Sequence, residues 1–171
     1  PFMQDKAEIT SLRDDLKAAR IRLRARFENQ SGPASMLYAH RKLVDSYLRK
    51  AWNNLDFPRD VALLAVGGFG HGSLFPYSDV DILVLLSNDP DEKLTAEIEE
   101  FIGRLWDIGL EVGHSVRTVS QCIDEANLDI TVSTTLLEAR PLVGNRRLVG
   151  ELHSEFRKQL DPHSFLKAKQ L

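Results

Sequence analysis

Hydrophobic residues recur every three or four positions in two stretches near the start of the chain, a spacing typical of amphipathic helices. The first stretch covers residues 6–27 and the second covers residues 35–55. SerGlyPro at 31–33 separates them and reads as a break in the chain. The pattern therefore predicts two successive helices before any strand.

The period then changes to short, continuous apolar runs, which are typical of buried strands. Two such runs lie at 61–66 and 81–86. A helical stripe follows, for which Asp89 is the expected N-cap, Pro90 the first helical residue and Gly109 the terminator. We thus expect two strands and then a helix.

The remainder of the chain is predicted to form one more strand and two more helices. Residues 110–118 read as a third strand, residues 131–140 as a helix that stops before Pro141, and residues 146–160 as a last helix. The order of elements predicts an α/β (α+β) domain in which a small mixed sheet is flanked by helices.

Composition narrows the class of protein. Cys122 is the one cysteine among 171 residues, which excludes an internal disulfide and a multi-cysteine zinc site. Net charge is −3, and the arginines within 6–27 lack interleaved aromatic residues, so we read them as a solvated helix face and expect no nucleic-acid partner. No apolar run approaches ~18 residues and the start lacks a signal-peptide layout, so we expect a cytoplasmic protein with no membrane contact.

A glycine-rich turn follows the first predicted strand, and its glycines are Gly67, Gly68, Gly70 and Gly72. Glycine lets the backbone approach a ligand closely, and successive free N–H groups form a concavity for anions. Neither a P-loop lysine nor the GxGxxG spacing is present. By itself, such a turn is more often structural than phosphate-binding.

Two aspartates open the second predicted strand. Because side chains on a strand alternate, Asp79 and Asp81 should share one face while Val80 and Ile82 lie on the other. Two neighbouring carboxylates repel one another unless a cation lies between them, and Mg²⁺ is commonly held by one or two carboxylates plus substrate phosphates. A glycine-rich turn followed by this pair predicts backbone N–H groups that bind phosphate beside carboxylates that bind a metal ion.

The segment GGFGHGSLFPYSDVDILVLL (67–86) resembles the signature of the DNA-polymerase-β-like nucleotidyltransferases. It is similar in particular to the nucleotidyltransferase domain of bifunctional uridylyltransferase/uridylyl-removing enzymes that act on the nitrogen-regulatory PII protein. The blocks at 105–118 and 129–145 also resemble this family. Two positions depart from its pattern: His71 stands where arginine is usual, and Ser73 where glutamate is usual.

The resemblance implies a reaction and roles for residues. Asp79 and Asp81 would hold two Mg²⁺ ions, while UTP is the substrate and a PII tyrosine hydroxyl the acceptor. Residues expected to bind the nucleotide are Gly67, Gly68, Gly70, His71 and Ser78.

The third carboxylate of the superfamily usually lies on the strand at 110–118, where the aligned residue here is Gly113. We favour Glu111, two residues earlier, over Asp129, which could instead cap the following helix. His114 is expected to be packed and hydrogen-bonded, and the two tryptophans, Trp52 and Trp106, to belong to the core.

The resemblance also implies a division of the chain. Residues 1–60 form N-terminal helices, 61–145 the transferase core and 146–171 a C-terminal helix, within a fragment of a longer multidomain enzyme. Alternatives remain at this stage: an adenylyltransferase of glutamine synthetase, another signalling nucleotidyltransferase, or a degenerate domain that binds a nucleotide or a partner without turnover.

Overall fold

The computed structural model describes residues 2–29, 33–66 and 80–159. Two long helices, α1 (Phe2–Asn29) and α2 (Pro33–Asn53), precede the sheet. Strands β1 (Val61–Ala65) and β2 (Val80–Leu86) are followed by α4 (Glu92–Asp107) and β3 (Val112–Thr118). Helices α5 (Val119–Leu128) and α6 (Ile130–Leu137), strand β4 (Arg140–Gly144) and helix α7 (Arg146–Gln159) complete the described chain.

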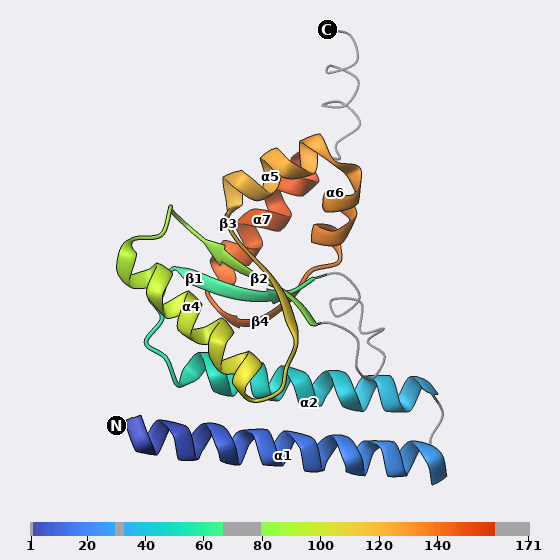
Figure 1. Cartoon of the computed structure of the whole chain (residues 1–171). Coiled ribbons are helices and arrows are strands. Elements are labelled where there is room, and N and C mark those ends of the chain that lie inside the picture. Colours follow the sequence, from blue (N-terminus) through green and yellow to red (C-terminus); the bar gives the residue numbers. More distant parts are fainter. Residues whose placement is uncertain (1, 30–32, 67–79, 160–171) are drawn as a thin grey trace, which may run out of the picture.

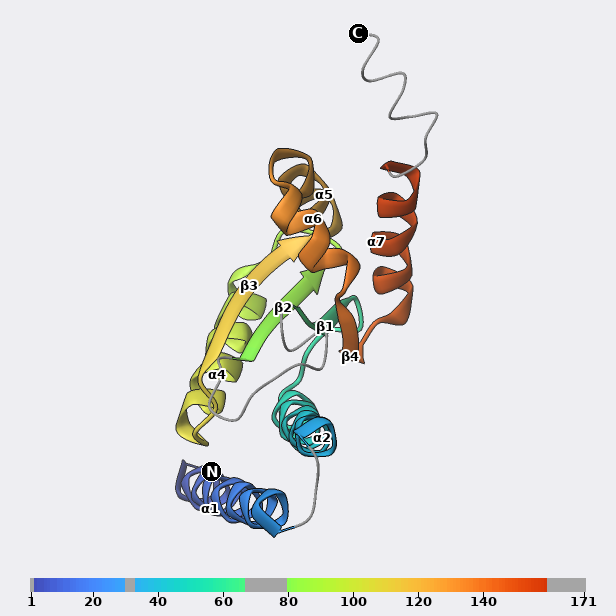
Figure 2. The same ribbon diagram turned by 90° about the vertical axis from the view of Figure 1, so that its right-hand side faces the viewer.

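The four strands form one mixed sheet in the order β3-β2-β1-β4. β1 is antiparallel to both β2 and β4, whereas β2 and β3 run parallel and side by side (Figure 2). Helices α1, α2 and α4 lie on one side of the sheet, and α5, α6 and α7 lie on the other (Figure 1). This three-layer arrangement agrees with the predicted small mixed sheet flanked by helices.

Strand alternation divides the buried side chains into two clusters. Leu63, Ile82 and Val84 face α2 and α4, whereas Leu64 and Leu83 face α5 and α7. A strand covered by helices on both faces must be apolar at every position, which explains the continuous hydrophobic runs of β1 and β2.

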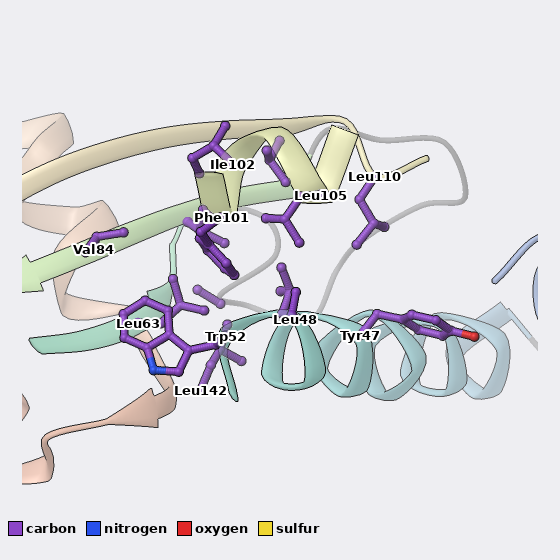
Figure 3. Close-up of a cluster of buried hydrophobic side chains, with 14 of the residues drawn as sticks. Tyr47, Leu48, Trp52, Leu63, Val84, Phe101, Ile102, Leu105, Leu110 and Leu142 are labelled. Atoms are coloured by element: carbon purple, nitrogen blue, oxygen red, sulfur yellow. The ribbon is translucent and has the colours of Figure 1, made fainter. Parts of the chain in front are cut away.

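Aromatic packing fixes α2 and α4 against the sheet in the first cluster (Figure 3). The Trp52 and Phe57 rings stack with centroids 3.7 Å apart, and Phe101 of α4 meets Trp52 edge-on at 5.4 Å. Trp52 is therefore a core residue, as predicted.

Helix ends follow local chemistry, with one correction to the prediction. Helix α4 begins at Glu92, and its N-cap is Asp91, whose carboxylate accepts a hydrogen bond from the Leu94 N–H at 2.8 Å. The prediction of Asp89 as cap and Pro90 as first helical residue was wrong because aspartates stand on both sides of the proline and either can cap. Gly109 ends α4 with φ of 94°, as predicted.

The sequence pattern did not predict two elements, helix α5 and strand β4. Helix α5 begins directly after β3 with a capping box between Thr118 and Gln121, a signature that the sequence does carry. The predicted helix at 131–140 ends at Leu137, because Arg140 and Pro141 belong to β4. Proline argues against a strand, but β4 lies at an edge of the sheet and its register shifts beside Pro141, where a missing N–H is tolerated.

Candidate functional site

Asp81 lies at the start of β2, as the second residue of that strand. Its side chain is exposed, whereas the next five residues of the strand are all buried. The backbone there is held by β1, since the Val66 N–H donates to the Asp81 carbonyl at 3.0 Å. Asp81 therefore offers a solvent-accessible carboxylate on a rigid strand.

Gly113 of β3 makes room for this carboxylate. The two residues are register partners in the parallel β2–β3 pair. A Cβ added to Gly113 would lie 2.4 Å from Asp81 Oδ1, closer than real Cβ contacts come. The carboxylate thus leans across the neighbouring strand into space that any other residue would fill. Gly113 is not among the described glycines with positive φ, so its role is the missing side chain and not its backbone conformation.

The same face of β3 continues through Ser115 and Arg117, as alternation predicted. Arg117 forms an ion pair with Glu125 of α5. Beneath it, Cys122 is fully buried, and burial raises the pKa of its thiol to about 11 although the Arg117 charge opposes the shift. Because thiolate is the nucleophilic form, Cys122 is a structural thiol.

Several predicted site residues fall outside the described part of the chain: Gly67, Gly68, Gly70, His71, Ser78 and Asp79. Of the two candidates for a third carboxylate, Glu111 is exposed and lies immediately before β3. Because it is outside the strand, alternation along β3 does not determine which face of the sheet its side chain is on. Asp129 is the N-cap of α6, where its carboxylate accepts from the Thr131 N–H at 2.9 Å. The capping function proposed for Asp129 is thus present.

Two predictions about neighbouring residues were wrong. His114 is exposed and not packed, because β3 is an edge strand. Trp106 is 54% exposed, because the buried stripe of α4 runs through Phe101, Ile102 and Leu105 and leaves the following residue outside.

A buried ion pair behind the site was not foreseen. The Arg140 guanidinium donates to both carboxylate oxygens of Asp45 at 2.7 and 3.0 Å, and the Asp45 side chain is only 8% exposed. Arg140 is the register partner of Ala65, near the end of β1, so the pair fastens α2 to the sheet close to Asp81. Nothing local signals a pair separated by 95 residues.

No described residues form a cluster of three or more His, Cys, Asp or Glu side chains able to hold a metal ion. Within the same part of the chain, no helix combines the length and hydropathy needed to cross a membrane. Among the described residues, Asp81 is therefore a candidate ligand and does not by itself form a metal site.

Comparison with known proteins shows which family this chain resembles. The family model for the nucleotidyltransferase domain matches residues 47–121, from the end of α2 into α5. A bifunctional uridylyltransferase/uridylyl-removing enzyme from Cupriavidus pinatubonensis is 51% identical over 160 residues, which cover 94% of this chain and 18% of that protein. An enzyme of the same description from Aromatoleum aromaticum is 46% identical over 97% of this chain and 19% of its own length.

A solved toxin–antitoxin structure with AMP-PNP has a TM-score of 0.43 and 13% identity, covering 74% of this chain and 98% of that one, a similarity too low to bear on the family. The chain spans about a fifth of the length of the curated relatives it matches. The family model and the similarity to these uridylyltransferase/uridylyl-removing enzymes identify the chain as a nucleotidyltransferase domain like that of those enzymes.

Proposed function

We propose that the chain transfers UMP from UTP to a tyrosine hydroxyl of the nitrogen-regulatory PII protein, in a reaction that requires Mg²⁺. The observation that carries the proposal is the exposed Asp81 carboxylate beside Gly113, at the start of the second strand of a nucleotidyltransferase domain. The similarity to proteins named uridylyltransferase supports the choice of UTP. The proposal concerns transfer alone and not removal of the uridylyl group.

The residues present fit a hard divalent cation. Asp81 supplies carboxylate oxygens, the ligand type that Mg²⁺ prefers, and the absent side chain of Gly113 gives this carboxylate room to lie over the neighbouring strand. Asp79 is the proposed second ligand. When bound, Mg²⁺ would lower the pKa of the acceptor hydroxyl and neutralise charge on the triphosphate and the leaving pyrophosphate.

The chain's own contribution is to position the reactants. Gly67, Gly68, Gly70, His71 and Ser78 are proposed to hold the triphosphate. The acceptor oxygen forms a bond to the α-phosphorus, the bond from that phosphorus to the β-phosphate oxygen breaks, pyrophosphate leaves and the hydroxyl proton is released. Glu111 is proposed as the third carboxylate. Catalysis of this kind depends mainly on orientation and on charge neutralisation.

The decisive experiment incubates the purified chain with PII protein, Mg²⁺ and UTP labelled at the α-phosphate. We expect label on PII, no label after addition of EDTA, and none with the Asp81→Asn variant. Parallel reactions with ATP and CTP test the base, since equal transfer from ATP would replace the uridylyl assignment by an adenylyl one. Nucleotide binding without transfer to any acceptor would indicate a degenerate domain.

A further inference from the structure

A basic groove lies between α1 and the turn that connects α4 to β3. Its cavity is about 300 Å³, and it is lined by Arg13, Leu16, Lys17, Arg20, Ile21, Arg24, Ile108 and Gly109. No acidic side chain is among these residues, although the chain as a whole carries a net charge of −3. The groove is therefore a local concentration of positive charge on an acidic protein.

The cations of the groove form a single row. Arg13, Lys17, Arg20 and Arg24 stand at i, i+4, i+7 and i+11 of α1, so they share one face of the helix and extend over about 16 Å. Arg13, Lys17 and Arg24 are exposed. If these cations only formed a solvated face of the helix, no apolar surface would be expected beside them, yet apolar residues lie beside this row.

The floor of the groove is apolar and partly open. Leu16 and Ile108 are buried beneath the row, while Ile21 is 61% exposed. A ligand that fits this surface combines negative charge with apolar side chains, as an acidic amphipathic segment of a protein does. Bare phosphates would use the row and leave Ile21 in water.

The groove is linked to the proposed active site through the turn between α4 and β3. The Arg20 guanidinium donates to the Gly109 carbonyl at 3.3 Å, which ties α1 to the turn after α4. Four residues beyond Gly109 the chain reaches Gly113, the register partner of Asp81. A protein seated on the groove would thus contact the segment that leads directly into the edge of the sheet where Asp81 lies.

We propose that this groove is the docking site for the acceptor protein and that it binds an acidic, partly apolar segment of that protein. The inference rests on the proposed function, because a transferase that modifies a protein side chain needs contacts with its acceptor besides those to the nucleotide. Electrostatic complementarity of this kind speeds association and selects the partner.

The test compares two double variants that change net charge equally. Arg13→Glu with Lys17→Glu reverses the row, while Lys93→Glu with Arg157→Glu reverses exposed cations on α4 and α7, outside the groove. The binding probe is a labelled 20-residue helical peptide with glutamates at i, i+4, i+7 and i+11 and leucines beside them. We expect the unaltered chain and the control to bind it, and the row variant to bind roughly 10-fold more weakly, with all affinities falling at high salt.

Transfer kinetics supply the second arm. With PII as acceptor, the row variant should raise KM for PII by roughly 10-fold while KM for UTP and kcat stay unchanged. Peptide binding without any transfer from UTP would refute the proposed function and leave the docking site standing. Equal KM for PII in both variants, with normal transfer, would overturn the docking site and leave the function standing.

Other occupants give different results, and each overturns the proposal. Binding of a uridine homopolymer RNA that is lost in the row variant, without binding of the peptide, would assign the groove to nucleic acid. A dimer seen by light scattering that the row variant abolishes would assign it to a second copy of the chain. Failure of the unaltered chain to bind the peptide would leave no docking site.

Discussion

Gly113→Ala isolates the contact between β3 and Asp81. The added Cβ would lie 2.4 Å from Asp81 Oδ1, whereas ordinary van der Waals contact begins at 3.4 Å, so the carboxylate must move by about 1 Å. The backbone need not move, because the atom in the way is the end of an exposed side chain.

The two consequences have different magnitudes. Replacing glycine in a strand interior recovers roughly 0.5–1 kcal/mol of conformational entropy, which offsets the cost of turning one exposed carboxylate. The free energy of unfolding should therefore change by less than about 1 kcal/mol. A 1 Å displacement of a catalytic group costs about 10²-fold in rate, or ~2.7 kcal/mol of transition-state stabilisation. Activity should fall while stability does not.

The assay measures kcat/KM for UTP over a range of Mg²⁺ concentrations, together with thermal unfolding of each variant. Gly103→Ala on α4 is the matched control, because its added Cβ would meet nothing within 4 Å. It should stabilise the helix by roughly 1 kcal/mol and leave turnover unchanged. Unchanged turnover of Gly113→Ala at every Mg²⁺ concentration would refute the link between Gly113 and Asp81, and a large loss of stability would refute the rotation of the carboxylate.

Three further predictions concern single side chains. Asp81→Asn should lower transfer by orders of magnitude without lowering Tm, and wild-type rates would remove Asp81 from the site. Glu111→Gln should reduce turnover with little loss of stability. Asp129→Ala should lower the free energy of unfolding by ~1 kcal/mol, as expected for a lost helix cap, and leave turnover nearly intact. The reverse pattern would make Asp129 the third carboxylate. Burial lowers the pKa of His40 to about 4, so unfolding free energy should fall by about 2–3 kcal/mol as pH drops from 6.5 toward 4, because the unfolded chain then binds the proton more tightly. Urea denaturation of His40→Leu across this pH range should lack that part of the slope.

Sequence pattern alone determined those elements whose signal is local. The two central strands of the sheet, β1 and β2, are continuous apolar runs because both of their faces are covered, and that composition is visible without a structure. Asp129 as a cap and Gly109 as a terminator also follow from chemistry within a few residues. The position of Asp81 at the start of a buried strand is likewise predicted by the sequence, because the two aspartates directly precede an apolar run.

Only the tertiary structure decided features that depend on distant partners. Strand β4 contains a proline that argues against a strand, and its place at the sheet edge is what makes that proline acceptable. His114 is exposed on an edge strand and Trp106 lies outside the buried stripe of α4, and neither position is visible in the local pattern. The space that Gly113 gives to Asp81 depends on strand register, since residues 32 positions apart become neighbours only when β2 and β3 pair in parallel.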